Sequence, residues 1–244
     1  MSEQDIQHKS GRQLKSHLYL TLSLENWEQE LQRLSQVPAR RLISPLFGTL
    51  CASSDLLRWR GISSLGQVVS RLIQEQGLEA ARVVLRRLTW SLNDESGGIG
   101  WGAPEALGEI QACSQQLALE YHRILLSFIN PGYEPGNFLE YTPLRRGAYW
   151  GLARLAQANP ELFAACKPTF MSCLAQEDQD GYILACAALF MGSLQPEAEE
   201  LQELQSRLRP LAGTQLRFYW NRQLCSLTLL QIAGPPLGLE AAEP

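Results

Sequence analysis

Leucines and other apolar residues recur every three or four positions along most of the chain, with polar residues between them. That period places the apolar side chains on one face of an α-helix. Helices are predicted over 16–34, 38–50, 55–76, 78–92, 104–114, 117–129, 144–158, 160–176, 180–194, 196–211 and 214–232. The start of the first range is ambiguous because its leucines alternate at first. No segment combines strand alternation with the turn residues of a hairpin, so the pattern predicts an all-α fold.

Turn residues mark several helix boundaries. Ser53, Ser54 and Asp55 provide N-terminal caps for the third predicted helix, and Gly77 ends it. The segment 130–143 holds three prolines and two glycines. Because both residue types interrupt helices, we expect this segment to be the longest loop of the chain.

Composition indicates a folded protein with short polar ends. The chain has 244 residues, of which 45% are hydrophobic, enough for a sizeable core. We expect a polar N-terminal tail over 1–13, a single domain over 14–232 and a flexible C-terminal tail over 233–244. The longest apolar run, 182–194, is shorter than the roughly 20 residues that cross a bilayer. Since the first residues also lack a secretory signal pattern, we expect no membrane span and a cytoplasmic location.

The predicted helices repeat with a period near 42 residues. Four stretches rich in small residues, RWRGISSLG, GWGAPEALG, LRRGAYWG and ACAALFMG, end at Gly66, Gly108, Gly151 and Gly192, with spacings of 42, 43 and 41 residues. HEAT and armadillo helix pairs repeat every roughly 40–47 residues. Over residues 38–211 the chain therefore resembles a HEAT-like, armadillo-type repeat protein.

This resemblance implies an α-solenoid of antiparallel helix pairs. Gly61, Ala103, Gly147 and Ala187 fall at one equivalent position, where we expect neighbouring repeats to approach closely. The string LNDESGGIGWGAPEALGEI, residues 92–110, is similar to one found in a group of uncharacterised bacterial HEAT-like proteins. That similarity implies a fold and no established activity.

The glycine-rich part of this string leads directly into a helix whose first turn contains Glu105. Backbone N–H groups of such a loop can form an anion-binding nest. Asp94 and Glu95 are themselves anions and are able to fill it. We expect one of them to accept hydrogen bonds from the loop or helix start, or to pair with Arg58 or Arg60. A ligand site in the loop is the alternative.

Charge is distributed unevenly along the chain. Residues 33–87 contain nine arginines and three acidic residues, whereas residues 88–141 contain seven acidic residues and one arginine. Adjacent repeats touch in a solenoid, so ion pairs between repeats are able to neutralise both segments. The chain has 18 arginines and 3 lysines, and arginine suits bidentate pairing with carboxylates or phosphates.

The repeat places Trp59, Trp101 and Tyr141 at corresponding helix entrances, near arginines and carboxylates. This edge is either a groove for a ligand or partner, since binding surfaces favour Trp, Tyr and Arg, or a set of aromatic plugs. The candidate binding residues are Arg58, Trp59, Arg60, Asp94, Glu95, Trp101, Glu105, Tyr141, Arg145 and Arg146.

Metal and catalytic chemistry find little support in the sequence. The six cysteines occur singly in apolar stretches without a CxxC pair, and the three histidines are scattered. We expect the cysteines to be small buried side chains and assign no metal ligand, cofactor or catalytic residue.

Three functions remain open. The first is a non-catalytic repeat scaffold that presents the aromatic and charged edge to a protein partner. The second is a protein that handles a cofactor or small ligand through Asp94, Trp101 and Glu105, by analogy with bilin lyases built from HEAT-like repeats. The third, a DNA-repair glycosylase of similar architecture, is disfavoured because the net charge is −4 and duplex binding requires a broad positive surface.

Overall fold

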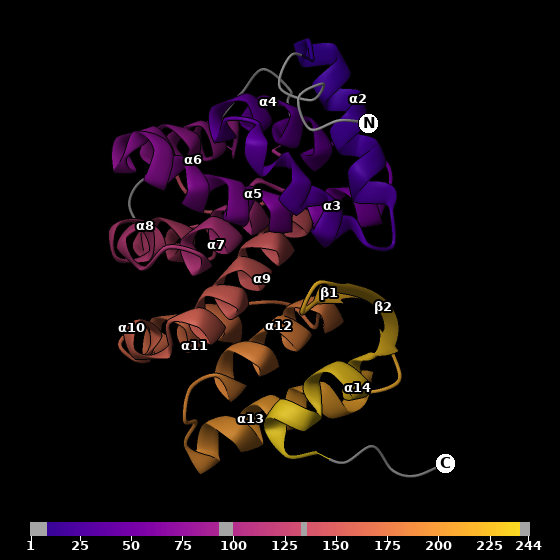
Figure 1. The fold of residues 1–244 in the computed structure, drawn as a ribbon. Coiled ribbons are helices and arrows are strands. Elements are labelled where there is room, and N and C mark those ends of the chain that lie inside the picture. Colours follow the sequence, from indigo (N-terminus) through magenta and orange to yellow (C-terminus); the bar gives the residue numbers. More distant parts are fainter. Residues whose placement is uncertain (1–8, 93–99, 133–135, 240–244) are drawn as a thin grey trace. The chain divides into compact units, whose positions relative to one another are not determined.

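The computed structural model describes residues 9–92, 100–132 and 136–239 (Figure 1). Within these ranges the regular elements are helices apart from one two-stranded sheet, and the prediction of an all-α fold is confirmed. The chain divides into two compact units, Met1–Cys113 (unit 1) and Ser114–Pro244 (unit 2). The expectation of one continuous domain stays a prediction.

Unit 1 is built around one long helix, α5. Its helices are α2 (Gly11–Ser23), α3 (Trp27–Arg33), η1 (Leu34–Gln36), α4 (Ala39–Leu50), α5 (Asp55–Gln76), α6 (Leu78–Leu92) and α7 (Ala103–Ala112). Helices α2, α4, α6 and α7 all pack against α5. The side chain of Ser54 accepts a hydrogen bond from the backbone N–H of Leu57, and Gly77 has a φ of +83°. These two boundaries are confirmed as predicted.

The first predicted helix is in fact two helices. Ser10 and Gln13 form a capping box that starts α2 at Gly11, within the expected tail. Leu24 has an extended backbone and ends α2, so α3 starts as a separate helix. Leu18 and Leu22 are buried at helical spacing, while the intervening leucine is exposed. The alternating leucines therefore belong to a helix with one apolar residue on its outer face.

Glycines in α5 allow close approach on two sides. A Cβ added at Gly66 would lie 2.8 Å from Sγ of Cys113 and 3.0 Å from Cγ of Glu109, so α5 and the end of α7 are in close contact there. A Cβ added at Gly61 would lie 1.8 Å from Oγ1 of Thr49 in α4. At Gly61 the close contact is thus made to α4, the other helix of the same predicted repeat, whereas we expected it between repeats.

Unit 2 has α9 and α12 at its centre, packed against each other. Its elements are α8 (Gln115–Ser127), α9 (Thr142–Ala158), α10 (Pro160–Ala164), α11 (Lys167–Ala175), α12 (Gly181–Gly192), α13 (Ala198–Leu208), η2 (Arg209–Leu211), β1 (Gln215–Trp220), β2 (Gln223–Thr228), α14 (Leu229–Ala233) and η3 (Pro235–Leu237). Helices α8 and α10 pack on α9, and α13, α14 and η3 pack on α12. The predicted helix over 160–176 is divided into α10 and α11.

The prediction of a helix over 214–232 is wrong. Strands β1 and β2 form an antiparallel hairpin in which Gln215 pairs with Thr228 (Figure 1). Asn221 and Arg222 have φ values of 47° and 66° and make the two-residue turn. Such a turn requires positive φ at both positions, which favours Asn and Gly. Only the end of the range, α14, is helical.

Long-range contacts hold the C-terminal part of unit 2 in place. The indole Nε1–H of Trp150 in α9 donates a 2.7 Å hydrogen bond to the backbone oxygen of Tyr219 in β1. In η3, Leu237 is buried, and a Cβ added at Gly192 would lie 2.5 Å from Cβ of Pro236. The segment that the sequence assigns to a flexible tail therefore includes an ordered turn against α12.

The longest helix in the described ranges is α5, with 22 residues. It carries five charged side chains and has polar positions throughout its length. Nowhere in the described part of the chain does a helix combine the length and the apolar character that a bilayer crossing requires.

Candidate functional site

One of the three aromatic residues of the predicted binding edge, Trp59, Trp101 and Tyr141, is buried. Trp59 in α5 is 5% exposed and belongs to the core of unit 1, which supports the packing interpretation for this residue. Trp101, just before α7, is half-buried. Tyr141 is 51% exposed and belongs to unit 2. Of the three aromatic residues, Tyr141 presents the largest accessible surface.

Arg60 has a structural role at the end of α2. Its Nη1 donates hydrogen bonds of 2.7 Å to the carbonyl oxygen of Leu22 and 2.8 Å to that of Leu24. The guanidinium also lies over the ring of Trp27, with Cζ 5.6 Å from the ring centroid. The carbonyl groups at a helix C-terminus lack intrahelical partners, so Arg60 satisfies two backbone acceptors at the turn between α2 and α3.

The acidic loop is represented in the described residues by Glu105 alone, because Asp94 and Glu95 lie outside them. Arg58 forms a 2.7 Å ion pair with Asp55 on its own helix. Glu105 lies in the first turn of α7, and its buried Oε2 has no hydrogen-bond partner. Burial raises the pKa of Glu105 to about 7, an effect that the positive charge of Arg58 partly opposes. Pairing of Asp94 or Glu95 with an arginine stays a prediction.

Arg145 and Arg146 connect the start of α9 to the segment before α12. Arg145 Nε lies 2.6 Å from Oε1 of Glu177, and Arg145 Nη1 donates to the carbonyl oxygen of Leu139 at 2.7 Å. Arg146 forms a 2.8 Å ion pair with Asp180, whose carboxylate also caps α12. Both arginines of this predicted site therefore tie backbone segments together within unit 2.

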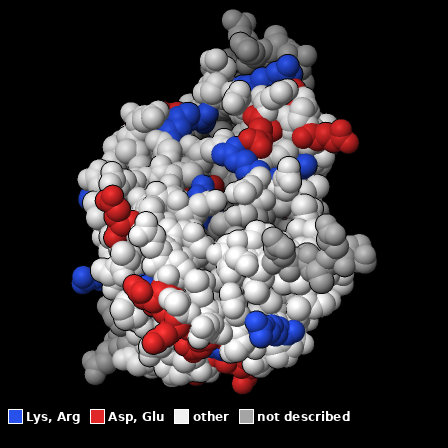
Figure 2. All heavy atoms as spheres, turned by 90° about the horizontal axis from the view of Figure 1, so that it is seen from below, with Lys and Arg blue, Asp and Glu red and all other residues white. Residues whose placement is uncertain are grey.

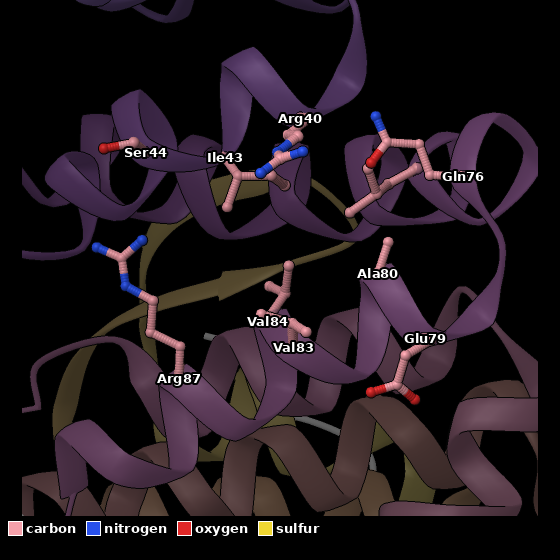
Figure 3. A pocket seen from close by; sticks show the side chains of 10 residues that line it. Arg40, Ile43, Ser44, Gln76, Glu79, Ala80, Val83, Val84 and Arg87 are labelled. Atoms are coloured by element: carbon pink, nitrogen blue, oxygen red, sulfur yellow. The ribbon is translucent and has the colours of Figure 1, made fainter.

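A groove of about 410 Å³ lies in unit 1 between α4 and α6, and the end of α5 completes its lining (Figure 3). Its lining residues are Arg40, Ile43, Ser44, Leu72, Gln76, Glu79, Ala80, Val83, Val84 and Arg87. In Figure 3, Arg40, Ile43 and Gln76 project from above, and Ala80, Val83 and Arg87 from the opposite side. None of these residues is among the sequence candidates.

The groove follows from the way successive helix pairs stack. Helices α4 and α6 are the first helices of successive pairs and both pack against α5. On the other side, α5 and α7 come into close contact at Gly66. The side chains of Ser44 and Ala80 in the lining are small and leave the space between α4 and α6 unfilled. The interface between the two helix pairs is therefore tightly packed between α5 and α7 and open between α4 and α6, where the groove lies.

Apolar side chains of α6 are exposed at and beside the groove. Val83 is 53% exposed and Trp90 is 76% exposed. These residues are seven positions apart, which places them on the same face of the helix. Ile43 and Val84 form a more deeply buried part of the lining. Apolar groups gathered on an exposed surface are typical of an interaction site.

Two arginines of the groove have no carboxylate partner within the described residues. Arg40 and Arg87 are both exposed, and neither forms an ion pair there. The guanidinium of Arg87 lies over the ring of Phe47, with Cζ 4.2 Å from the ring centroid. Because this contact leaves the N–H donors of the guanidinium edge unused, Arg87 retains the capacity to bind an anion.

The carboxylate in the lining, Glu79, is already neutralised. Its Oε1 lies 2.6 Å from Nη2 of Arg86, and its Oε2 lies 3.3 Å from Nη1 of Arg82. Hydrogen bonds from these two arginines lower the pKa of Glu79. Because its carboxylate is held by Arg82 and Arg86, Glu79 does not neutralise Arg40 or Arg87.

Sequence reasoning missed the groove although two signals for it were present. The basic character of residues 33–87 includes Arg40 and Arg87. Val83 and Trp90 also fall on the polar face of a helix whose buried face is marked by Val84 and Leu88. Apolar residues on both faces of an otherwise amphipathic helix indicate a second contact surface.

Metal-ligating groups do not gather in the described parts of the chain: no group of three or more His, Cys, Asp or Glu side chains there has the proximity to hold an ion. The cysteines are free thiols. Cys173 and Cys186 are buried as expected, whereas Cys51 is exposed, so the expectation of burial is wrong for that residue.

Charge is mixed on the face of the molecule drawn in Figure 2. Basic and acidic side chains both occur on it, and most of the described surface there is uncharged. A duplex-binding surface requires a wide basic area, and this face does not supply one within its described residues.

Comparisons with known proteins give little guidance. No family model matches the chain, and no curated protein matches it. Among solved structures, a designed armadillo repeat protein is similar over 97% of this chain and 97% of its own, with 17% sequence identity and a TM-score of 0.49. This degree of similarity supports no inference about a ligand or partner.

Proposed function

We propose that this protein is a non-catalytic helical repeat scaffold and that the groove between α4 and α6 binds a segment of a protein partner. The observation that carries this proposal is the exposure of Val83 and Trp90 beside two arginines, Arg40 and Arg87, that lack ion pairs within the described residues.

The composition of the surface supports a protein partner. Trp and Arg are the residue types most enriched at the energetic centres of protein interfaces. Trp90 lies outside the lining of the groove but on the same helix face as Val83. A small ligand confined to the groove would leave Trp90 exposed, whereas a protein segment lying along α6 covers both side chains.

Ligand handling at the start of α7 is the second candidate function. It is favoured by the buried Oε2 of Glu105, which has no hydrogen-bond partner, and by the pKa of about 7 for this carboxyl group. A group that titrates near neutrality suits proton transfer or binding to a cationic ligand. Absorbance and mass spectrometry of protein purified from its native host would detect a retained chromophore or ligand.

Site-specific crosslinking tests the scaffold proposal. A photoreactive phenylalanine analogue is placed at Val83, at Trp90 or at Leu119, which is 58% exposed on α8 and serves as the control. After irradiation in cells of the native host, we expect the same discrete protein adduct from positions 83 and 90 and none from 119. The adduct at position 90 should weaken when Val83→Glu is added. Adducts of equal yield at all three positions would contradict the proposal.

A further inference from the structure

We propose that the segment bound by the groove is an acidic amphipathic helix of the partner. Its carboxylates pair with Arg40 and Arg87, and its apolar side chains cover Val83 and Trp90. This inference rests on the proposed function and adds the chemistry of the partner.

Charge complementarity favours an acidic segment. Arg40 and Arg87 extend from opposite sides of the groove (Figure 3) and have no carboxylate partner within the described residues. Each guanidinium is able to donate two parallel hydrogen bonds to one carboxylate. Because Glu79 is held by Arg82 and Arg86, it does not compete for these two groups. A basic segment would instead meet two positive charges that no carboxylate of the described residues neutralises.

The spacing of the exposed groups favours a helical segment. Val83, Arg87 and Trp90 occur at positions i, i+4 and i+7 of α6 and therefore form one stripe along about 10 Å of its axis. Arg40 and Ile43 lie across the groove on α4. A third helix lying between two others presents apolar and charged groups at this period, as in other helix-in-groove complexes.

The apolar stripe distinguishes this occupant from a nucleic acid. Phosphate groups would also pair with Arg40 and Arg87, but a phosphate backbone offers no apolar surface to cover Val83 and Trp90. The acidic helix satisfies both the charged and the apolar components of the groove.

Peptide display provides the first part of the test. Random 16-residue peptides on phage are selected on the full-length protein and screened against the uncharged groove variant Val83→Asn. Circular dichroism and thermal unfolding first establish that this variant folds like the parent. We expect peptides that lose binding to the variant to be rich in Asp and Glu at helical spacing, with Leu, Ile or Phe between them.

Charge reversal provides the second part. The double variant Arg40→Glu, Arg87→Glu should weaken binding of the best selected peptide at least tenfold. It should also bind more tightly a version of that peptide with its acidic residues replaced by Lys. The matched control is Arg12→Glu, Arg123→Glu, in which two other exposed arginines are reversed. We expect the control to retain binding of the acidic peptide within about twofold.

The outcomes separate the two proposals. Peptides that depend on Val83 but are neutral or basic would overturn the acidic helix and leave a protein-binding groove. Failure of every selected peptide to discriminate the Val83→Asn variant would overturn both. Displacement of the peptide by a single-stranded DNA oligonucleotide, with dependence on Arg40 and Arg87 but not on Val83, would identify a general polyanion site and also overturn the acidic helix.

Discussion

Gly61 of α5 faces Thr49 of α4 so closely that a Cβ added to the glycine would lie 1.8 Å from Oγ1 and 2.6 Å from Cβ of the threonine. The Thr49 hydroxyl is fixed, because it donates a 2.6 Å hydrogen bond to the carbonyl oxygen of Leu46. Both Gly61 and Thr49 are buried, so neither helix is able to relieve the overlap by turning a side chain into solvent.

Gly61→Ala should therefore destabilise the protein by roughly 1–3 kcal/mol, the usual cost of overpacking a core. Gly11→Ala is the control, because a Cβ at that position meets nothing within 4 Å. It should leave stability unchanged or slightly raised, since alanine restricts the unfolded chain. Urea unfolding of the two variants measures the difference. Equal midpoints would show that α4 moves away from α5 at little cost.

The hydrogen bond from Trp150 to Tyr219 leads to a second prediction. Trp150→Phe keeps an aromatic ring but removes the indole N–H that donates to the buried carbonyl oxygen of Tyr219, which should cost about 1–3 kcal/mol. The control Trp90→Phe changes an exposed ring and should have almost no effect on stability. Hydrogen exchange at the amides of β1 and β2 should accelerate only in the Trp150 variant. Unchanged protection would show that other contacts hold the hairpin.

The helices of the chain were predictable where local signals define them. Ser54 as a cap, Gly77 with positive φ and Pro104 in the first turn of α7 act through their own backbone neighbours, so the sequence reveals them directly. The hairpin was not predictable in this way. Its turn residues, Asn221 and Arg222, include no glycine, and the contact that anchors it joins residues 69 positions apart.

The candidate site was predictable only in its general charge. The excess of arginine in residues 33–87 is evident from the sequence, yet the individual arginines have different roles. Arg60 is engaged by two backbone carbonyl groups, whereas Arg87 faces a groove. Which guanidinium group remains available depends on the packing of α4 and α6 around α5, and a local pattern does not encode that arrangement.

The ion pair between Arg145 and Glu177 provides a third prediction. The two side chains are 12% and 7% exposed, and two hydrogen bonds, 2.6 Å and 2.9 Å long, join them. Glu177→Gln leaves the guanidinium with a neutral partner in a mostly dry setting and should cost about 3–5 kcal/mol. Arg33→Gln, which breaks the exposed pair with Glu30, should cost less than about 1 kcal/mol.

A double-mutant cycle measures the coupling in this pair. Arg145→Gln combined with Glu177→Gln should be less destabilising than the sum of the single changes, because the second substitution removes the unpaired charge left by the first. Additive effects in urea unfolding would show that Arg145 acts mainly through its hydrogen bonds to the carbonyl oxygens of Leu139 and Glu140.

Glu105 gives the fold a specific dependence on pH. Burial raises the pKa of its carboxyl group from 4.5 to about 7, so between these values the folded state binds a proton that the unfolded state has lost. Stability therefore falls as pH rises from about 4.5 to 7, and the loss persists at higher pH. Glu105→Gln removes the ionisation and should be near neutral at pH 4.5. At pH 8 it should stabilise the protein by about 1–3 kcal/mol. This is less than the free energy equivalent to the whole pKa shift, because Oε2 is buried but the residue as a whole is partly exposed.

Urea unfolding of the parent and Glu105→Gln at pH 4.5, 6 and 8 tests this prediction, with Glu79→Gln as the control for an exposed carboxylate. The stability of the Glu105 variant relative to the parent should rise with pH. For Glu79, whose pKa is lowered by Arg86 and Arg82, the substitution should cause a small loss of stability at each of these pH values.

Adding Arg58→Gln to the parent should steepen the fall of stability with pH, because Arg58 favours the charged form of Glu105. If Glu105→Gln is destabilising at pH 8, the prediction is wrong, and the charged carboxylate is stabilised in the folded state by Arg58, by backbone N–H groups at the start of α7 or by a bound cation.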